Sequence, residues 1–322
     1  MKSPMNASSS ETTRRVPVLR ILGTLLSVGL LVYLLSQQGW GEIWKAVQGI
    51  PYWRLILAFA LMIVSRFAVT GRWHTLLSSS GLEVRLGQTI RITFAGLFAS
   101  NFLPTTIGGD VVRLAGVLQL RLDAAVCAAS LIADRLVGMA GMAMALPFGL
   151  PFFLHSPAVH ASFSLSTPRV AGGISLPFVG ERGRALASKG LRLSRRLFES
   201  LSLWLHQPRA LLAALVFTWI HMLCLFSILF LLFGGMGENI PLLLIGGLYS
   251  LVYFVTLLPI SINGYGVQEI SMTFIFSTVV GASLSSALSA ALLFRTMMVL
   301  ASLPGVFFVP EMLSRVRKAP QT

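Results

Sequence analysis

The sequence predicts an all-α polytopic membrane protein of about eight transmembrane helices, with two segments broken by proline and glycine. Hydrophobic residues make up 55% of the 322 residues and charged residues only 11%, and the mean hydropathy is +0.80. Soluble globular domains carry about 25% charged residues. Apolar runs long enough to cross a bilayer recur along the chain. Seven and nine crossings are the open alternatives.

The candidate spans are the apolar runs of bilayer length. They are 18–36, 55–73, 124–154, 210–233, 241–258 and 270–310. The last run is long enough for two helices, with the turn expected at the Gly- and Ser-rich residues 281–286. Residues 88–107 either span or re-enter. The same choice applies to 155–178, which is polar and proline-broken; if that segment spans, 88–123 is a re-entrant hairpin.

Loop charge predicts the orientation. Lys and Arg outnumber Asp and Glu by 25 to 11, and most cations lie between apolar runs, so cytoplasmic loops explain the excess better than a nucleic-acid partner. Both termini are therefore expected on the cytoplasmic side of the cell membrane. The predicted organisation is a basic cytoplasmic tail (1–17), one transmembrane domain (18–310) with a basic interfacial helix at about 181–206, and a cytoplasmic tail (311–322).

The cysteines and histidines follow no pattern of a metal site. Cys127 and Cys224 both lie inside apolar runs, so core-packing thiols are expected. The five histidines show no metal-ligand spacing. No metal and no cofactor are therefore expected.

Two short segments interrupt apolar runs with the same residue order. Leu-Pro-x-x-Ile-x-Gly occurs at 103–109 and again at 258–264. Proline removes a backbone donor and glycine frees the dihedral angles, so a helix is expected to unwind at both places. Unwound backbone persists in a membrane only where protein or a wet cavity covers it. Paired breaks in the two halves of a membrane protein therefore indicate a substrate site between inverted repeats.

Several ionisable residues lie within or beside the apolar runs. They are Arg66, Asp110, Arg113, Asp134, Arg135, Glu269 and Arg295. Each such group costs about 2.5–3.5 kcal/mol in lipid, so we expect these residues to pair or to face a wet interior. Asp110 and Arg113 are three residues apart and can meet on one helix face. If a helix begins at Asp110, its carboxylate also caps that helix.

The other charged residues near the spans invite simpler interpretations. Asp134 and Arg135 are adjacent and point about 100° apart on a helix, so at least one must reach another helix. Arg295 and Glu269 are the expected counter-charges. Near the end of the second span, snorkelling arginines and an interfacial tryptophan explain Arg66, Arg72 and Trp73 without a function.

The motifs, taken in order, resemble the lysylphosphatidylglycerol synthase transmembrane-region family. The matching elements are Arg66 with 71–77, Asn101 to Pro104, Gly108-Gly-Asp-Val-Val-Arg113, Ala133-Asp-Arg-Leu136, Pro259 to Glu269, and Arg295. They cover nearly the whole chain, although Asp134 stands where the family usually has Glu. The resemblance implies a flippase-like bundle with re-entrant segments. Its better-understood members move aminoacylated phospholipid and carry a soluble aminoacyltransferase domain, which is not expected here, so lysylphosphatidylglycerol is not assumed as the substrate.

The breaks and the resemblance together favour a protein that binds and translocates a phospholipid or lipid-linked headgroup. Arginines match phosphate oxygens bidentately, the Asn and acidic side chains suit amine or hydroxyl groups, and the glycines would offer backbone amides to an anion. The predicted substrate-binding residues are Arg66, Asn101, Gly108, Gly109, Asp110, Arg113, Asp134, Arg135, Asn263, Gly264, Gly266, Glu269 and Arg295. No catalytic residue is predicted.

The expected ligand is an anionic phospholipid or a lipid-linked sugar headgroup, and a separate lipid synthase is a candidate partner. No ATP-binding loop is present, so transport would be passive or ion-driven. Two alternatives stay open. One is an accessory or structural subunit of a lipid-modifying or glycolipid pathway, and the other is a membrane transferase acting on a lipid-phosphate substrate.

Overall fold

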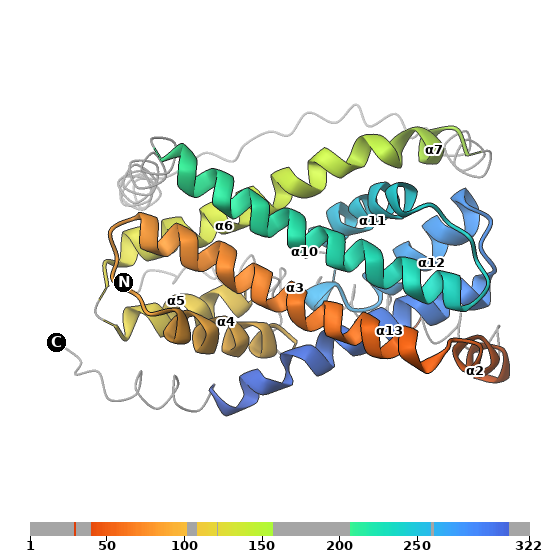
Figure 1. The fold of residues 1–322 in the computed structure, drawn as a ribbon, viewed down its shortest axis with the longest axis horizontal. Helices are drawn as coiled ribbons and strands as arrows, with labels where there is room; N and C mark the ends of the chain where they lie inside the picture. Colours follow the sequence, from red (N-terminus) through yellow and green to blue (C-terminus); the bar gives the residue numbers. More distant parts are fainter. Residues whose placement is uncertain are drawn as a thin grey trace, which may run out of the picture.

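The computed structural model of the chain describes Gly29 and residues 40–101, 108–120, 122–156, 207–258 and 261–308. Every regular element within these ranges is helical, and the helices form an elongated bundle (Figure 1). The all-α class is therefore confirmed. The predictions for 1–17, 18–36, 181–206 and 311–322, and for nearly all of 155–178, lie outside the described residues.

Among the described residues, four helices are long and apolar enough to cross a membrane. They are α3 (Tyr52–Ser79), α6 (Ala124–Ala145) with its 3₁₀ extension η1 (Leu146–Phe148), α10 (Pro208–Gly235), and α13 (Leu284–Ser302) with its extension η3 (Leu303–Phe307). Large apolar side chains point outward from them; Leu212 on α10 is 62% exposed. Such a surface suits hydrocarbon and confirms the polytopic membrane class. The crossing number of about eight stays a prediction.

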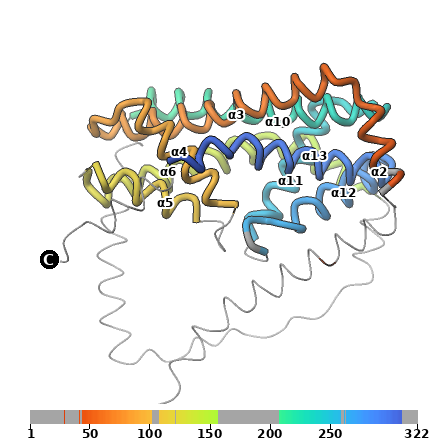
Figure 2. Tube along the Cα trace, turned by 90° about the horizontal axis from the view of Figure 1, so that it is seen from below, coloured from red at the N-terminus to blue at the C-terminus, as the bar shows by residue number. Residues whose placement is uncertain are grey.

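Four shorter helices form two pairs. α4 (Leu86–Ser100) and α5 (Gly108–Leu118) flank the first break, and α11 (Leu242–Thr256) and α12 (Val267–Val279) flank the second. A helix of 15 residues is about 22 Å long, whereas the hydrocarbon core is about 30 Å thick. Each of the four is shorter than that thickness over its described residues. The α4–α5 pair enters the bundle from one end and the α11–α12 pair from the opposite end (Figures 1 and 2).

The predicted division of 270–310 into two helices is confirmed. α12 ends at Val279, Gly281 has a positive φ of 74°, and α13 begins at Leu284. The Ser283 hydroxyl accepts a hydrogen bond from the Ser286 amide and so caps α13. The remaining short helices are α2 (Trp40–Gln48) and α7 (Leu150–Leu154).

Small residues let the long helices approach closely. α3 and α10 run side by side in opposite directions (Figure 1). A Cβ added at Gly71 on α3 would lie 2.6 Å from the Phe217 ring on α10, and one at Gly141 on α6 would lie 2.4 Å from the Thr218 side chain. Helices in lipid gain little from hydrophobic burial, so this close packing holds them together.

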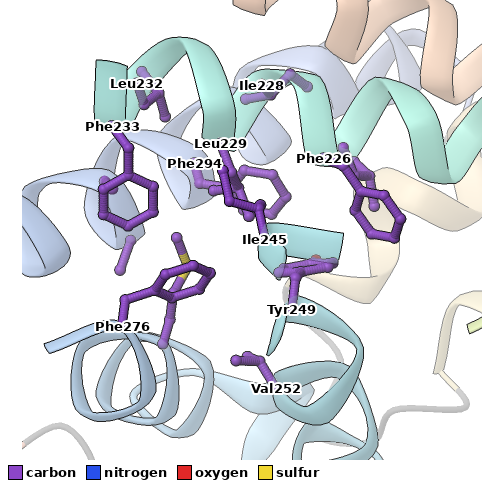
Figure 3. Packing of buried hydrophobic residues seen from close by; sticks show 14 of the residues in the cluster. Phe226, Ile228, Leu229, Leu232, Phe233, Ile245, Tyr249, Val252, Phe276 and Phe294 are labelled. Atoms are coloured by element: carbon purple, nitrogen blue, oxygen red, sulfur yellow. The ribbon is translucent and has the colours of Figure 1, made fainter. Parts of the chain in front are cut away.

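The largest hydrophobic cluster joins α10 to α11, α12 and α13 (Figure 3). The ring centroids of Phe233 and Phe276 are 4.8 Å apart, and those of Tyr249 and Phe294 are 5.3 Å apart. Cys224 on α10 is also buried and free, as is Cys127 on α6, which confirms the expected packing thiols. The cluster holds the second break against the long helices.

A close backbone contact in this half leads to a stability prediction. A Cβ at Gly247 on α11 would lie 2.1 Å from the Gly149 nitrogen, between η1 and α7. We expect Gly247→Ala to force α11 away and to destabilise the protein by about 1–3 kcal/mol, measured as a lower melting temperature in detergent. Gly87→Ala is the control because a Cβ there meets open space. Equal melting temperatures for the two variants would contradict the packing described.

Candidate functional site

A polar cavity of about 330 Å³ lies inside the bundle, and both broken segments reach it. Ser100 at the end of α4, Asn101 just after it and Asp110 in the first turn of α5 line it from the first half. Thr256 at the end of α11 and Asn263 in the second break line it from the second half. Two segments far apart in sequence therefore share one partly open cavity.

The first half builds a network of ion pairs centred on Asp134, which is 2% exposed. Its Oδ1 accepts a hydrogen bond from Arg72 Nε at 2.6 Å, and its Oδ2 accepts one from Arg113 Nη1 at 3.1 Å. Arg113 Nη1 also donates to Asp110 Oδ1 at 3.2 Å, and Arg135 Nε donates to Asp110 Oδ2. The predicted pair of Asp110 and Arg113 is thus confirmed, and the network ties α3, α5 and α6 together.

The structure corrects the interfacial interpretation of Arg72 and Trp73. Trp73 is fully buried, its Nε1 donates to Ser130 Oγ at 3.1 Å, and its ring lies 4.0 Å below the Arg113 guanidinium carbon. Arg72 is 8% exposed. Both residues lie inside because α3 continues to Ser79. A cation over an aromatic face gains most when it is desolvated, as here.

The expected counter-charges for Asp134 and Arg135 were also wrong. Glu269 and Arg295 instead pair with each other through Arg295 Nε and Glu269 Oε1. Arg295 Nη2 also donates to the Gly264 carbonyl at 3.2 Å. Their helices, α12 and α13, are direct neighbours, so Arg295 finds its acid in its own half. The two halves therefore contain separate ion-pair networks.

The second break is unwound as predicted. Asn263 has a φ of 49°, and Gly264 and Gly266 have φ values of 71° and 77°. Only glycine adopts this left-handed region freely, with Asn the usual exception. Residues 102–107 and 259–260, which include the prolines of both breaks, lie outside the described residues.

The helix start after the first break differs from the conditional prediction. α5 begins at Gly108, so Asp110 lies in the first turn and is not the cap. Its negative charge still lies at the positive end of the helix dipole. A Cβ at Gly109 would lie 2.7 Å from the Gly96 carbonyl oxygen, so this glycine permits the close contact of α5 with α4.

The predicted site residues divide into two groups. The cavity wall includes Arg66, Asn101, Asp110, Arg113, Asp134, Arg135, Asn263 and Arg295. Gly108, Gly109, Gly264, Gly266 and Glu269 are not part of that wall. The Gly266 amide donates to Glu269 Oε2 at 2.8 Å, so the expectation that this amide is free for an anion was wrong. The binding role of all thirteen residues stays a prediction.

Some wall residues were missed at the sequence level. His221 on α10 lines the cavity, and its Nδ1 lies 2.7 Å from Ser65 Oγ. Its isolation within an apolar run was the available signal, because polar side chains in lipid-facing segments are costly. Gln268, Tyr249 and Tyr253 also line the cavity. Gln268 lies inside the motif Pro259 to Glu269 and directly before Glu269, which was the available signal, whereas nothing in the local sequence of Tyr249 and Tyr253 distinguishes them from ordinary packing residues.

The family model described as lysylphosphatidylglycerol synthase TM region matches residues 20–305. The chain belongs to this family. The match spans both breaks and every residue of the cavity wall, which lies between Arg66 and Ser302. The resemblance inferred from the motifs is therefore confirmed, and the protein is a membrane protein of a lipid-related family. No curated protein matched the chain.

The Asp134 network leads to a test of stability. Asp134→Asn leaves Arg72 and Arg113 buried without their shared negative charge, and we expect a loss of about 3–5 kcal/mol. Arg66→Met is the matched comparison, because Arg66 has no acidic partner among the described residues; its stability should be unchanged or raised. Thermal unfolding in detergent measures both variants. An Asp134→Asn protein as stable as the wild type would mean that the network contributes little.

Proposed function

We propose that this protein binds a phospholipid or lipid-linked headgroup in the cavity and moves it between leaflets. The observation that carries the proposal is one polar chamber, reached by both breaks and lined by five arginines, inside a bundle with an apolar surface. A lipid headgroup needs such a polar route through hydrocarbon, because desolvating its charge is costly. The membership in a lipid-related family supports the same conclusion.

The arrangement of the short helices supports movement from one side to the other. The α4–α5 and α11–α12 pairs enter from opposite ends of the bundle (Figures 1 and 2), as expected for inverted repeats around a central site. Re-entrance of both pairs is part of the proposal. Rocking of one half against the other would open the cavity to each leaflet in turn.

The proposed location is the cell membrane with both termini in the cytoplasm. In that orientation the outer ends of α4 and α5 are cytoplasmic, where the exposed Arg85 and Arg91 lie, and those of α11 and α12 lie outside. The N-terminal ends of α6 and α10 lie at the same end of the bundle (Figure 1). In the proposed orientation, α6 and α10 therefore both begin on the cytoplasmic side.

Transport of a headgroup is tested in vesicles that contain the purified protein and a fluorescent phospholipid, with an impermeant quencher outside. We expect Arg113→Ala and Glu269→Ala to slow translocation at least about tenfold, because each removes a charged hydrogen-bond partner. Arg209→Ala is the control, since Arg209 is exposed and outside the cavity wall. Unchanged scrambling in both the Arg113→Ala and the Glu269→Ala protein would refute the mechanism.

The same assay separates the alternatives. An accessory subunit would give no translocation in the purified wild type, while the charge substitutions would lower protein abundance in cells. A transferase would turn over a lipid-linked sugar or lipid phosphate in detergent. We propose a non-enzymatic role because the carboxylates at the cavity are all held by arginines, and a general base needs a free proton-accepting position.

The inverted arrangement is tested by cysteine labelling of a background in which Cys127 and Cys224 are replaced by Ala. Single cysteines at Gly87 and Leu243 report on α4 and α11, both at exposed positions. We expect an impermeant maleimide to label position 243 in intact cells and position 87 only after the membrane is opened. Labelling of both positions from one side would rule out the inverted arrangement.

A further inference from the structure

The three acids at the cavity have their charge already compensated. All six carboxylate oxygens of Asp110, Asp134 and Glu269 accept hydrogen bonds from arginine side chains or a backbone amide. Short charge-assisted bonds of this kind bind a carboxylate strongly. A cationic headgroup amine entering the cavity would have to compete with an arginine already in place.

The arginines at the cavity are not compensated to the same extent. Five of them line its wall among the residues that the structure describes, against three acids at or behind it, which is an excess of two positive charges. The excess is concentrated in the cavity, where the low dielectric of the surroundings strengthens every electrostatic interaction. A ligand with two negative charges would neutralise it.

Arg66 is the clearest source of this excess. It is 6% exposed and lines the cavity. The one hydrogen bond of its side chain within the described residues runs from Nη2 to the weak acceptor Met62 Sδ at 3.3 Å, and its buried Nε has no hydrogen-bond partner there. A buried guanidinium without an anion is costly, and buried polar atoms normally find partners. The Nε and Nη2 atoms of Arg113 are likewise without a hydrogen-bond partner.

We propose that the cavity selects a lipid headgroup with a doubly charged terminal phosphate group, a phosphomonoester or a diphosphate, and that Arg66 binds this phosphate. The proposal rests on the proposed function and names the substrate class of the same site. A phosphomonoester carries about 1.5 to 2 negative charges at pH 7, which matches the excess in the cavity. A phosphodiester carries one, and an aminoacyl phospholipid has a positively charged headgroup amine in addition.

The test measures binding without transport. The purified full-length protein in neutral detergent is titrated with phosphatidic acid, phosphatidylglycerol, phosphatidylcholine and lysylphosphatidylglycerol of equal chain length, and complexes are counted by native mass spectrometry. We expect phosphatidic acid to bind most tightly, phosphatidylglycerol less, and the other two least. Lysylphosphatidylglycerol binding as tightly as phosphatidic acid would overturn the proposal.

Substitutions of Arg66 test whether this residue binds the phosphate. Arg66→Met should bind phosphatidic acid at least about tenfold more weakly, which is the loss expected for a charged hydrogen-bond partner. Arg66→Lys keeps the charge without the bidentate geometry, so its affinity for phosphatidic acid should lie between those of the wild type and Arg66→Met. Arg209→Met removes an exposed arginine and should bind as the wild type does. An Arg66→Met protein that keeps its melting temperature and its affinity for phosphatidic acid would exclude this residue.

A soluble-phosphate arm separates the two possible sources of the anion. Pyrophosphate at the same concentration should not displace phosphatidic acid, because it lacks the acyl chains that contact the apolar bundle. Full displacement would overturn the assignment to a lipid. A failure of the proposed function can be told apart from a failure of this inference. If only transport is wrong, the binding order holds in detergent while the vesicles show no translocation.

Discussion

The pairing of buried charge holds the first half of this protein in its conformation. Asp134 has almost no solvent exposure and joins Arg72 on α3 to Arg113 on α5 through its two oxygens. In a low dielectric an unpaired carboxylate or guanidinium is costly to bury. The position of each helix therefore depends on the helix that carries the partner charge. Trp73, buried on α3, packs its ring under the Arg113 guanidinium of the same network.

In the second half, a different set of residues satisfies the same need to pair buried charge. Glu269 holds both the Gly266 amide and Arg295, so the start of α12 is bound to α13 and to the unwound backbone before it. Left-handed residues at the break let the chain turn inside the bundle instead of continuing as a rod. Polar backbone that would be costly in lipid is covered by protein and by the shared cavity.

The charge balance at the cavity differs from that of an ordinary ion-pair network. Paired arginines and acids stabilise the walls, but Arg66 brings a positive charge that no described acid compensates. A protein that only needed a stable bundle would gain from an apolar residue there. The uncompensated charge of Arg66 is therefore the observation on which the proposed anion-binding role rests.

The sequence by itself determined the class of the protein, the approximate position of its long helices, and the two breaks, because hydropathy, proline and glycine act locally on the backbone. It also marked the ionisable residues that lipid would penalise, and the local pair of Asp110 and Arg113. Which charge pairs with which across helices was decided only by tertiary structure, since it depends on helix neighbours rather than on spacing. For this reason the sequence did not predict the pairing of Arg72 with Asp134 or of Arg295 with Glu269, or the position of Tyr249 on the cavity wall.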